Sequence, residues 1–172
     1  MLYFNNYINQ ITTALENMIV TTHEGHTLEN DGGLAQWCQL THRVKDENKT
    51  MYFVGNGASA MMASHMAADA SKNGQFRSHA FNDVALMTAV SNDIAYEDCF
   101  AVPLKRFANA GDVLVTISSS GNSPNIIKAI ETAHELGIAV VTVSGMKPDN
   151  RSRQMGEINF YVPGETYGIV ES

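Results

Sequence analysis

Two short loops carry the residues best suited to bind a ligand. The first reads Gly-Asn-Gly-Ala-Ser-Ala over residues 55–60, and the second reads Ser-Ser-Ser-Gly-Asn-Ser over residues 118–123. Each loop follows an apolar segment typical of a buried strand and precedes a stretch typical of a helix. Glycines let the backbone approach a ligand closely, and the free N–H groups at a helix start attract anions. With four serine hydroxyls, these features predict a phosphate site that needs no basic side chain.

A histidine and an aspartate follow the first loop with a spacing of one helical turn. Because residues i and i+4 share one face of a helix, His65 and Asp69 can reach the same site. Such a pair can bind a metal ion or take part in proton transfer. The alternative is that Asp69 only orients or neutralises His65, or that both side chains face the solvent.

The first loop also fits the dinucleotide-binding pattern G-x-G-x-x-A, with Ala60 at the last position. That pattern is followed after about 20 residues by an acidic residue that binds a ribose hydroxyl. Position 75 is Gln75, and Asp83 comes late. We therefore expect no nucleotide cofactor. A nicotinamide-dependent enzyme remains an alternative that requires measurable dinucleotide binding.

Short apolar segments alternate with helical stretches in the last two thirds of the chain. The pattern predicts strands over 51–54, 77–81, 113–117, 138–143 and 158–162, and helices over 59–71, 95–108 and 124–136. Near-continuous apolar strands alternating with helices are typical of a parallel sheet covered on both faces. The loops after the strands then lie along one edge, where ligands of such folds bind. We expect an α/β protein: a three-layer α/β/α sandwich with a five-stranded parallel sheet of the flavodoxin-like type.

Two amphipathic helices are predicted ahead of this sheet. Their apolar stripes cover residues 4–19 and 34–44, with a polar connection between them. We expect residues 1–48 to form an N-terminal helical segment, and residues 49–172 to form the α/β domain. The first stripe has the character of a contact either with this domain or with a neighbouring subunit.

Composition narrows the class of protein further. The 172 residues are enough for one domain, and 44% hydrophobic residues predict a packed core. Eleven Lys and Arg against eighteen Asp and Glu give a net charge of −7, which argues against nucleic acid as a main partner. No apolar run approaches the roughly 20 residues that cross a bilayer. Two distant cysteines predict no disulfide framework. We expect a cytoplasmic protein without a membrane partner.

The two loops, with Ser91-Asn92-Asp93 between them, resemble the sugar isomerase (SIS) domain family, and within it the phosphoheptose isomerase branch. The resemblance implies an aldose–ketose isomerase that converts sedoheptulose 7-phosphate to D-glycero-D-manno-heptose 7-phosphate through an enediol. It implies a role in making heptose for a surface polysaccharide, either lipopolysaccharide or capsule. It also implies a homotetramer with sites between subunits, and zinc in some members.

The resemblance also implies roles for individual residues. Substrate contacts fall on Asn56, Gly57, Ala58, Ser59, Asn92 and Asp93, and the sugar phosphate is held by Ser118, Ser119, Ser120 and Ser123. His65 matches a histidine that binds zinc in some members. Asp69 stands where the family usually has a glutamate that serves as metal ligand and acid/base. Both are therefore candidate catalytic residues and candidate zinc ligands.

The sequence departs from the family's pattern at several positions. Ala58 replaces a glycine, and Asp69 is one methylene shorter than the usual glutamate. Val170 stands where phosphoheptose isomerases usually carry a glutamine that binds metal or substrate. The family's last histidine would fall beyond Ser172, so we expect the site either to be incomplete or to need residues outside this sequence. These departures favour, as the alternative function, a non-catalytic phosphosugar-binding or protein-interaction module.

Overall fold

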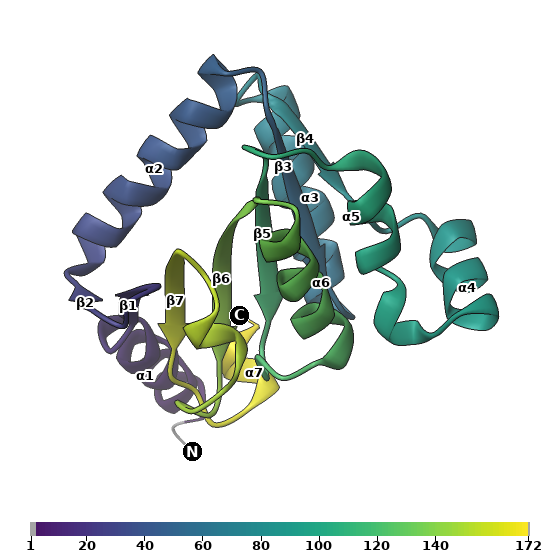
Figure 1. Cartoon of the computed structure of the whole chain (residues 1–172). Coiled ribbons are helices and arrows are strands. Elements are labelled where there is room, and N and C mark those ends of the chain that lie inside the picture. The colour runs from purple at the N-terminus through teal and green to yellow at the C-terminus, as the bar shows by residue number, and fades with distance from the viewer. Residues whose placement is uncertain (1–2, 172) are drawn as a thin grey trace.

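The computed structural model describes residues 3–171 and shows one mixed sheet with helices on both faces (Figure 1). The strands are β1 (Ile19–Thr22), β2 (Thr27–Leu28), β3 (Thr50–Gly55), β4 (Arg77–Ala80), β5 (Val113–Ser118), β6 (Ala139–Gly145) and β7 (Ile158–Val162). The helices are α1 (Tyr3–Glu16), α2 (Asn30–Asp46), α3 (Ala58–Lys72), α4 (Val84–Asp93), α5 (Ala101–Phe107), α6 (Pro124–Glu135) and α7 (Tyr167–Val170). Two 3-10 turns are η1 (Tyr96–Asp98) and η2 (Ser152–Gln154).

The five predicted strands form the parallel part of the sheet, in the order β7-β6-β5-β3-β4. The prediction of five strands was too low, because β1 and β2 extend the sheet to seven. Strand β1 pairs antiparallel with β7, and β2 pairs antiparallel with β1. The fold class is therefore confirmed, with an antiparallel hairpin added at one edge.

The added hairpin corrects two expectations for the N-terminal segment. Helix α1 ends at Glu16, so the predicted helical stripe does not extend to Ile19. The run Ile-Val-Thr-Thr of β1 consists of β-branched residues, which favour a strand over a helix. Gly25 adopts a φ of 81° in the turn that follows, a conformation that glycine takes without strain. Residues 19–28 thus form a hairpin that includes the end of the predicted helical stripe and part of the expected polar connection.

Alternating side chains of the central strands form the two halves of the core. On one face, Met51, Phe53 and Val115 pack in a cluster with buried residues of α2 and α3. On the other face, Tyr52 and Leu114 pack in a cluster with buried residues of α5 and α6. This period-2 alternation buries both faces of the sheet, which confirms the three predicted layers (Figure 1).

The region between β4 and β5 differs from the single helix predicted over residues 95–108. Helix α4 comes first, and the Asp83 carboxylate caps it by accepting a 2.7 Å hydrogen bond from the Leu86 N–H. Turn η1 and helix α5 follow as separate elements. Pro103 explains the break, because proline lacks an N–H and is tolerated only in the first turn of a helix.

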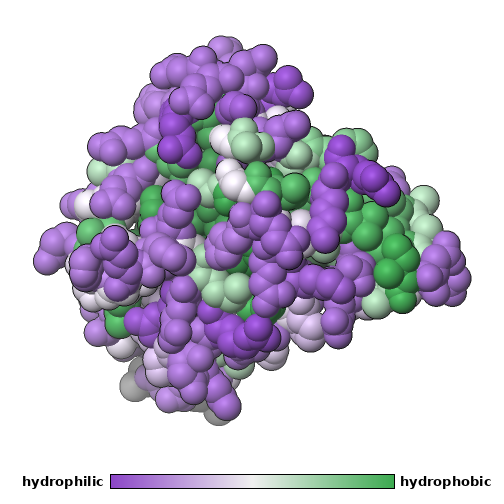
Figure 2. Space-filling view, viewed as in Figure 1, coloured by the Kyte–Doolittle hydropathy of each residue, from purple (hydrophilic) through white to green (hydrophobic). Residues whose placement is uncertain are grey.

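The two N-terminal helices differ in how they are covered. Helix α2 packs on the sheet, with the Trp37 ring centroid 5.3 Å from that of Phe160. Helix α1 buries only Ala14, and its large apolar residues Tyr3, Phe4, Ile8 and Leu15 are exposed. A second gathering of hydrophobic surface lies on the side formed by α4 and α5 (Figure 2).

None of the helices within residues 3–171 has the length and apolar character that crossing a membrane requires. The predicted division of the chain into residues 1–48 and 49–172 stays a prediction.

Candidate functional site

A pocket of about 130 Å³ lies at the edge of the sheet where β3 and β5 end. Its lining comes from three segments and consists of Asn56, Ser59, Ser118, Ser119, Ser120, Ser123, Tyr167 and Glu171. Strands β3 and β5 are parallel neighbours, with Gly55 opposite Ile117, so the loops that follow them lie side by side. The fold therefore brings together six of the ten predicted substrate-contacting residues.

The serine loop is held in shape by the segment that follows β6. Gly121 has a φ of 61°, and its N–H donates to the Ser118 carbonyl and hydroxyl oxygens. The Gly121 carbonyl accepts a 2.9 Å hydrogen bond from the Ser152 N–H. The Asn150 side chain is fully buried, packs directly against Gly121, and donates to the Lys147 carbonyl at 2.9 Å. These contacts fix the loop before any ligand arrives.

The pocket has the features of a site for an anion, although no basic side chain of the described residues lines it. Among the described residues no Lys, Arg or His lines it, so hydroxyls and backbone groups must hold a ligand. Helix α6 begins directly behind the loop, with Ser123 as its N-cap and Pro124 as its first residue. The Ser123 side chain makes no capping hydrogen bond, which leaves its hydroxyl available to a ligand. The partial positive charge at the start of α6 favours an anion such as phosphate.

Asn56 is fixed in the pocket by a hydrogen-bond network that reaches α6 and η1. Its amide bonds reciprocally with the amide of Asn125, at 2.9 Å and 2.8 Å. The Tyr96 hydroxyl donates to Asn56 Oδ1 at 2.8 Å, and Asn125 Nδ2 also donates to Cys99 Sγ at 3.3 Å. Burial raises the pKa of the Tyr96 hydroxyl and the pKa of the Cys99 thiol, so both stay neutral around pH 7.

Glu171 places a carboxylate in the same pocket. The Ser119 hydroxyl donates to Glu171 Oε1 at 2.6 Å, which joins the serine loop to the residue that caps the end of α7. A carboxylate at this position opposes a second anion, because like charges repel. Tyr167 and Glu171 were not among the predicted site residues, and neither was Asn125. Their contacts join segments far apart in the sequence, which local motifs do not reveal.

His65 and Asp69 meet on α3, as their spacing predicts, but they do not line this pocket. His65 Nε2 lies 3.3 Å from Asp69 Oδ2, and the two side chains are 79% and 53% exposed. Asn73 Nδ2 donates to the other Asp69 oxygen at 3.1 Å. The pair therefore faces the solvent in a single chain.

A zinc ion would need more ligands than this pair supplies. Catalytic zinc sites take three protein ligands. Among residues 3–171, no three His, Cys, Asp or Glu side chains are placed to hold a metal ion together. Val170 cannot replace the missing ligand, since its side chain has no donor atom. The residues of one chain do not fit a complete zinc site.

The other predicted contact residues lie beside the pocket and do not line it. Asn92 and Asp93 end α4, where Asn92 Nδ2 donates to Asp93 Oδ1 at 2.8 Å and both side chains are exposed. Asn92 and Tyr96 line a shared surface hollow. Because the Tyr96 hydroxyl also bonds Asn56, this hollow adjoins the first loop. Gly57 and Ala58 are exposed at the start of α3.

Comparisons with known proteins agree with this fold and site. The sequence matches the SIS domain family over residues 6–145. The phosphoheptose isomerase of Akkermansia muciniphila is 35% identical over 95% of this chain and 86% of the relative. The phosphoheptose isomerase of Nitratidesulfovibrio vulgaris is 30% identical over 83% of this chain, which spans 61% of that relative's length. The structure of phosphoheptose isomerase GmhA from Neisseria gonorrhoeae superimposes with a TM-score of 0.82 at 25% identity, over 98% of this chain and 87% of that one.

A mostly parallel α/β sheet with a hydroxyl-lined pocket at the carboxyl ends of its strands places the chain in the class of α/β domains that bind ligands at this edge. The chain belongs to the SIS domain family, and within it to the phosphoheptose isomerases.

We predict that Gly121→Ala destabilises the protein and weakens the binding of inorganic phosphate. A methyl group at this position would collide with the Asn150 side chain, and its positive φ strains any residue with a Cβ. A loss of about 2 kcal/mol in the free energy of unfolding is expected, measurable by urea denaturation. Gly32→Ala is the control, because its Cβ would meet open space on α2 and should stabilise the helix. Equal stability of the two variants would contradict this account.

We predict that Glu171→Gln tightens the binding of inorganic phosphate. The change removes a negative charge from the pocket and retains an oxygen to accept the Ser119 hydrogen bond. Calorimetric titration should show a several-fold lower Kd than for the native protein. Glu165→Gln, outside the pocket lining, is the charge-matched control and should leave the Kd unchanged. Weaker binding by Glu171→Gln would show that the carboxylate supports the ligand.

Proposed function

We propose that this protein is an isomerase that converts sedoheptulose 7-phosphate to D-glycero-D-manno-heptose 7-phosphate. The observation that carries the proposal is the gathering of five serines and Asn56 in one pocket, in a chain that belongs to the phosphoheptose isomerases. The product would serve heptose synthesis for a surface polysaccharide, such as lipopolysaccharide or capsule, in the cytoplasm.

The proposed reaction moves a proton between C1 and C2 of the sugar through an enediol. It needs a base near these carbons, a group that polarises the carbonyl, and a firm hold on the distant phosphate. The serine loop would bind the phosphate, which orients the reacting carbons as well as adding affinity. Asp69 is the proposed base, with His65 as its partner. His65 and Asp69 supply two of the three protein ligands of a catalytic zinc, and no third His, Cys, Asp or Glu of residues 3–171 joins them.

We propose further that the reacting groups come together in a homotetramer with sites between subunits. The His65–Asp69 pair is exposed and does not line the pocket of its own chain, so a second chain could complete the site. Two uncovered apolar surfaces support an assembly. One is the stripe on α1, and the other lies on the α4–α5 side, where Val84, Ile94 and Phe107 are exposed (Figure 2).

The proposed activity is tested by incubating the purified protein with sedoheptulose 7-phosphate, with and without added zinc, and following the aldose by NMR. Turnover is expected, and Asp69→Asn should reduce kcat by at least about 100-fold because it removes the base. Asp46→Asn, an exposed residue at the end of α2, is the matched control and should remain active. Binding of the substrate without turnover would support a non-catalytic phosphosugar-binding module instead.

The proposed assembly is tested by light scattering. The native protein should have the mass of a tetramer, and Ile8→Glu should lower that mass because it places a charge in the exposed apolar stripe of α1. Asn6→Glu, on the opposite side of the helix, adds the same charge and should leave the mass unchanged. A native monomer with full activity would contradict a site shared between subunits.

A further inference from the structure

Asn125 is a buried polar residue behind the pocket and not part of its lining. It is the second residue of α6 and only 1% exposed, yet its amide is fully engaged. Its Oδ1 accepts from Asn56 Nδ2, and its Nδ2 donates to both Asn56 Oδ1 and Cys99 Sγ. A buried amide with all its hydrogens bonded stabilises one arrangement of the groups around it.

The network determines which hydrogen bonds the Asn56 side chain can still make to a ligand. An amide oxygen accepts two hydrogen bonds, and an amide nitrogen donates two. Within the described residues, Asn56 Oδ1 already accepts from the Tyr96 hydroxyl and from Asn125 Nδ2. Asn56 Nδ2 donates one hydrogen bond, to Asn125 Oδ1, which leaves one N–H unused in a residue that lines the pocket.

We propose that Asn125 is a positioning residue. It holds Asn56 so that the Asn56 amide donates a hydrogen bond to an oxygen atom of the sugar phosphate and cannot accept one from the ligand. By bonding both atoms of the Asn56 amide, it prevents the amide from turning its oxygen to the ligand. It also ties the loop after β3 to the start of α6, which keeps the first loop and the serine loop at a fixed spacing. The proposal rests on the proposed isomerase activity for its kinetic test.

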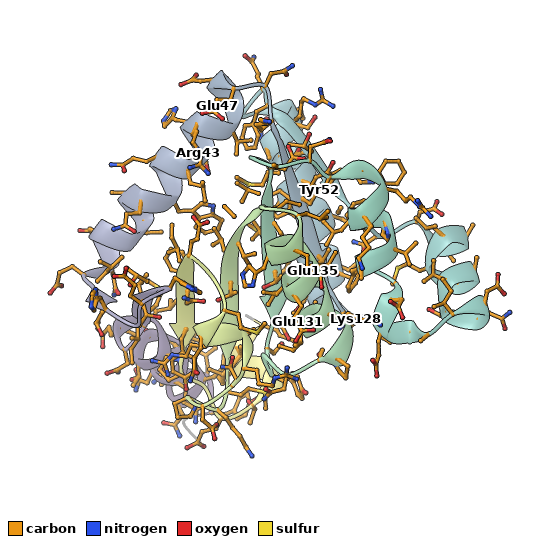
Figure 3. All side chains as sticks on the ribbon, viewed as in Figure 1. Arg43, Glu47, Tyr52, Lys128, Glu131 and Glu135 are labelled. Atoms are coloured by element: carbon orange, nitrogen blue, oxygen red, sulfur yellow. The ribbon has the colours of Figure 1, made fainter. Side chains whose placement is uncertain are left out.

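The groups around the network leave it electrically neutral. Tyr96 and Cys99 contact it directly, and burial raises the pKa of each. Asp98 on η1 and Lys128 on α6 lie on the elements that carry the network, and they pair with each other at 2.8 Å (Lys128 is labelled in Figure 3). Because both neighbours stay neutral, protonation of a carboxyl group placed at position 125 would change the charge of this network, and burial raises the pKa of such a group.

The test is the substitution Asn125→Asp, which keeps the shape of the side chain and removes its N–H donors. An ionised carboxylate would set an oxygen against Asn56 Oδ1, and turning the Asn56 amide would only move the clash to the other oxygen. We expect kcat/KM at pH 8 to fall by roughly 100-fold. The loss should shrink toward pH 5, because the introduced carboxyl group, once protonated, can donate to Asn56 again. Far-UV circular dichroism and thermal unfolding at each pH establish that the variant is folded.

Two further variants separate positioning from general stability. Asn109→Asp makes the same chemical change just before β5 begins, whereas the pocket lies where β5 ends. This variant should keep the native pH profile. In an Asn56→Ala background, Asn125→Asp should have little additional effect on kcat/KM, because Asn125 acts through Asn56. Additive losses, or a loss that does not depend on pH, would overturn the proposal.

Tyr96→Phe tests the network without disturbing a buried residue. It removes one hydrogen bond to Asn56 Oδ1 and should lower kcat/KM several-fold in the native background, with no effect in Asn56→Ala. If the native protein shows no turnover, the proposed function has failed. The same variants are then compared by calorimetry for their affinity for sedoheptulose 7-phosphate. There the same pH-dependent loss supports the positioning role, and its absence overturns it.

Discussion

The parallel pairing of β3 with β5 is the constraint on which the site depends. Because the two strands run side by side, the first loop and the serine loop leave the sheet at the same edge. The reciprocal amide bonds between Asn56 and Asn125 then hold these loops together beyond the last backbone pairs of the strands. Both faces of the sheet are buried under helices, so the strands cannot shift in register without exposing core residues.

The proposed binding of an anion by a protein with a net charge of −7 must depend on the groups that line the pocket. Serine hydroxyls and the start of α6 supply hydrogen-bond donors and a partial positive charge, whereas none of the lining residues that the structure describes is basic. Such groups lose their value if they move, which explains why the serine loop is braced by Gly121, Asn150 and Ser152. Selectivity against other anions then comes from geometry more than from net charge.

The sequence predicted the parallel sheet and both loops, because local patterns encode them. Apolar strands alternating with helices, and glycine or serine runs after strands, are visible within a few residues. The hairpin of β1 and β2 was missed because its short β-branched run continues the apolar stripe of the preceding helix. Helix α4 was missed because its run Val-Ala-Leu-Met-Thr-Ala-Val is apolar almost throughout and shows no amphipathic stripe. Asn125, Tyr96 and Glu171 were missed for another reason. Their bonds to Asn56 or Ser119 span 69, 40 and 52 residues, and only the folded chain shows them.

The His65–Asp69 pair is separate from the pocket of its own chain, and this separation determines what the replacement of the family's usual glutamate by Asp69 means for the site. An aspartate is one methylene shorter than a glutamate, so it reaches less far from the axis of α3. That difference matters little if Asp69 only neutralises His65 at the surface, and it matters greatly if the carboxylate must reach a sugar held by another chain. In the second case, the packing between subunits must bring α3 closer to the neighbouring pocket. The exposed apolar residues of α1 and of the α4–α5 side are the surfaces that can provide such packing. The packing between subunits therefore determines whether the shorter side chain of Asp69 can reach the sugar.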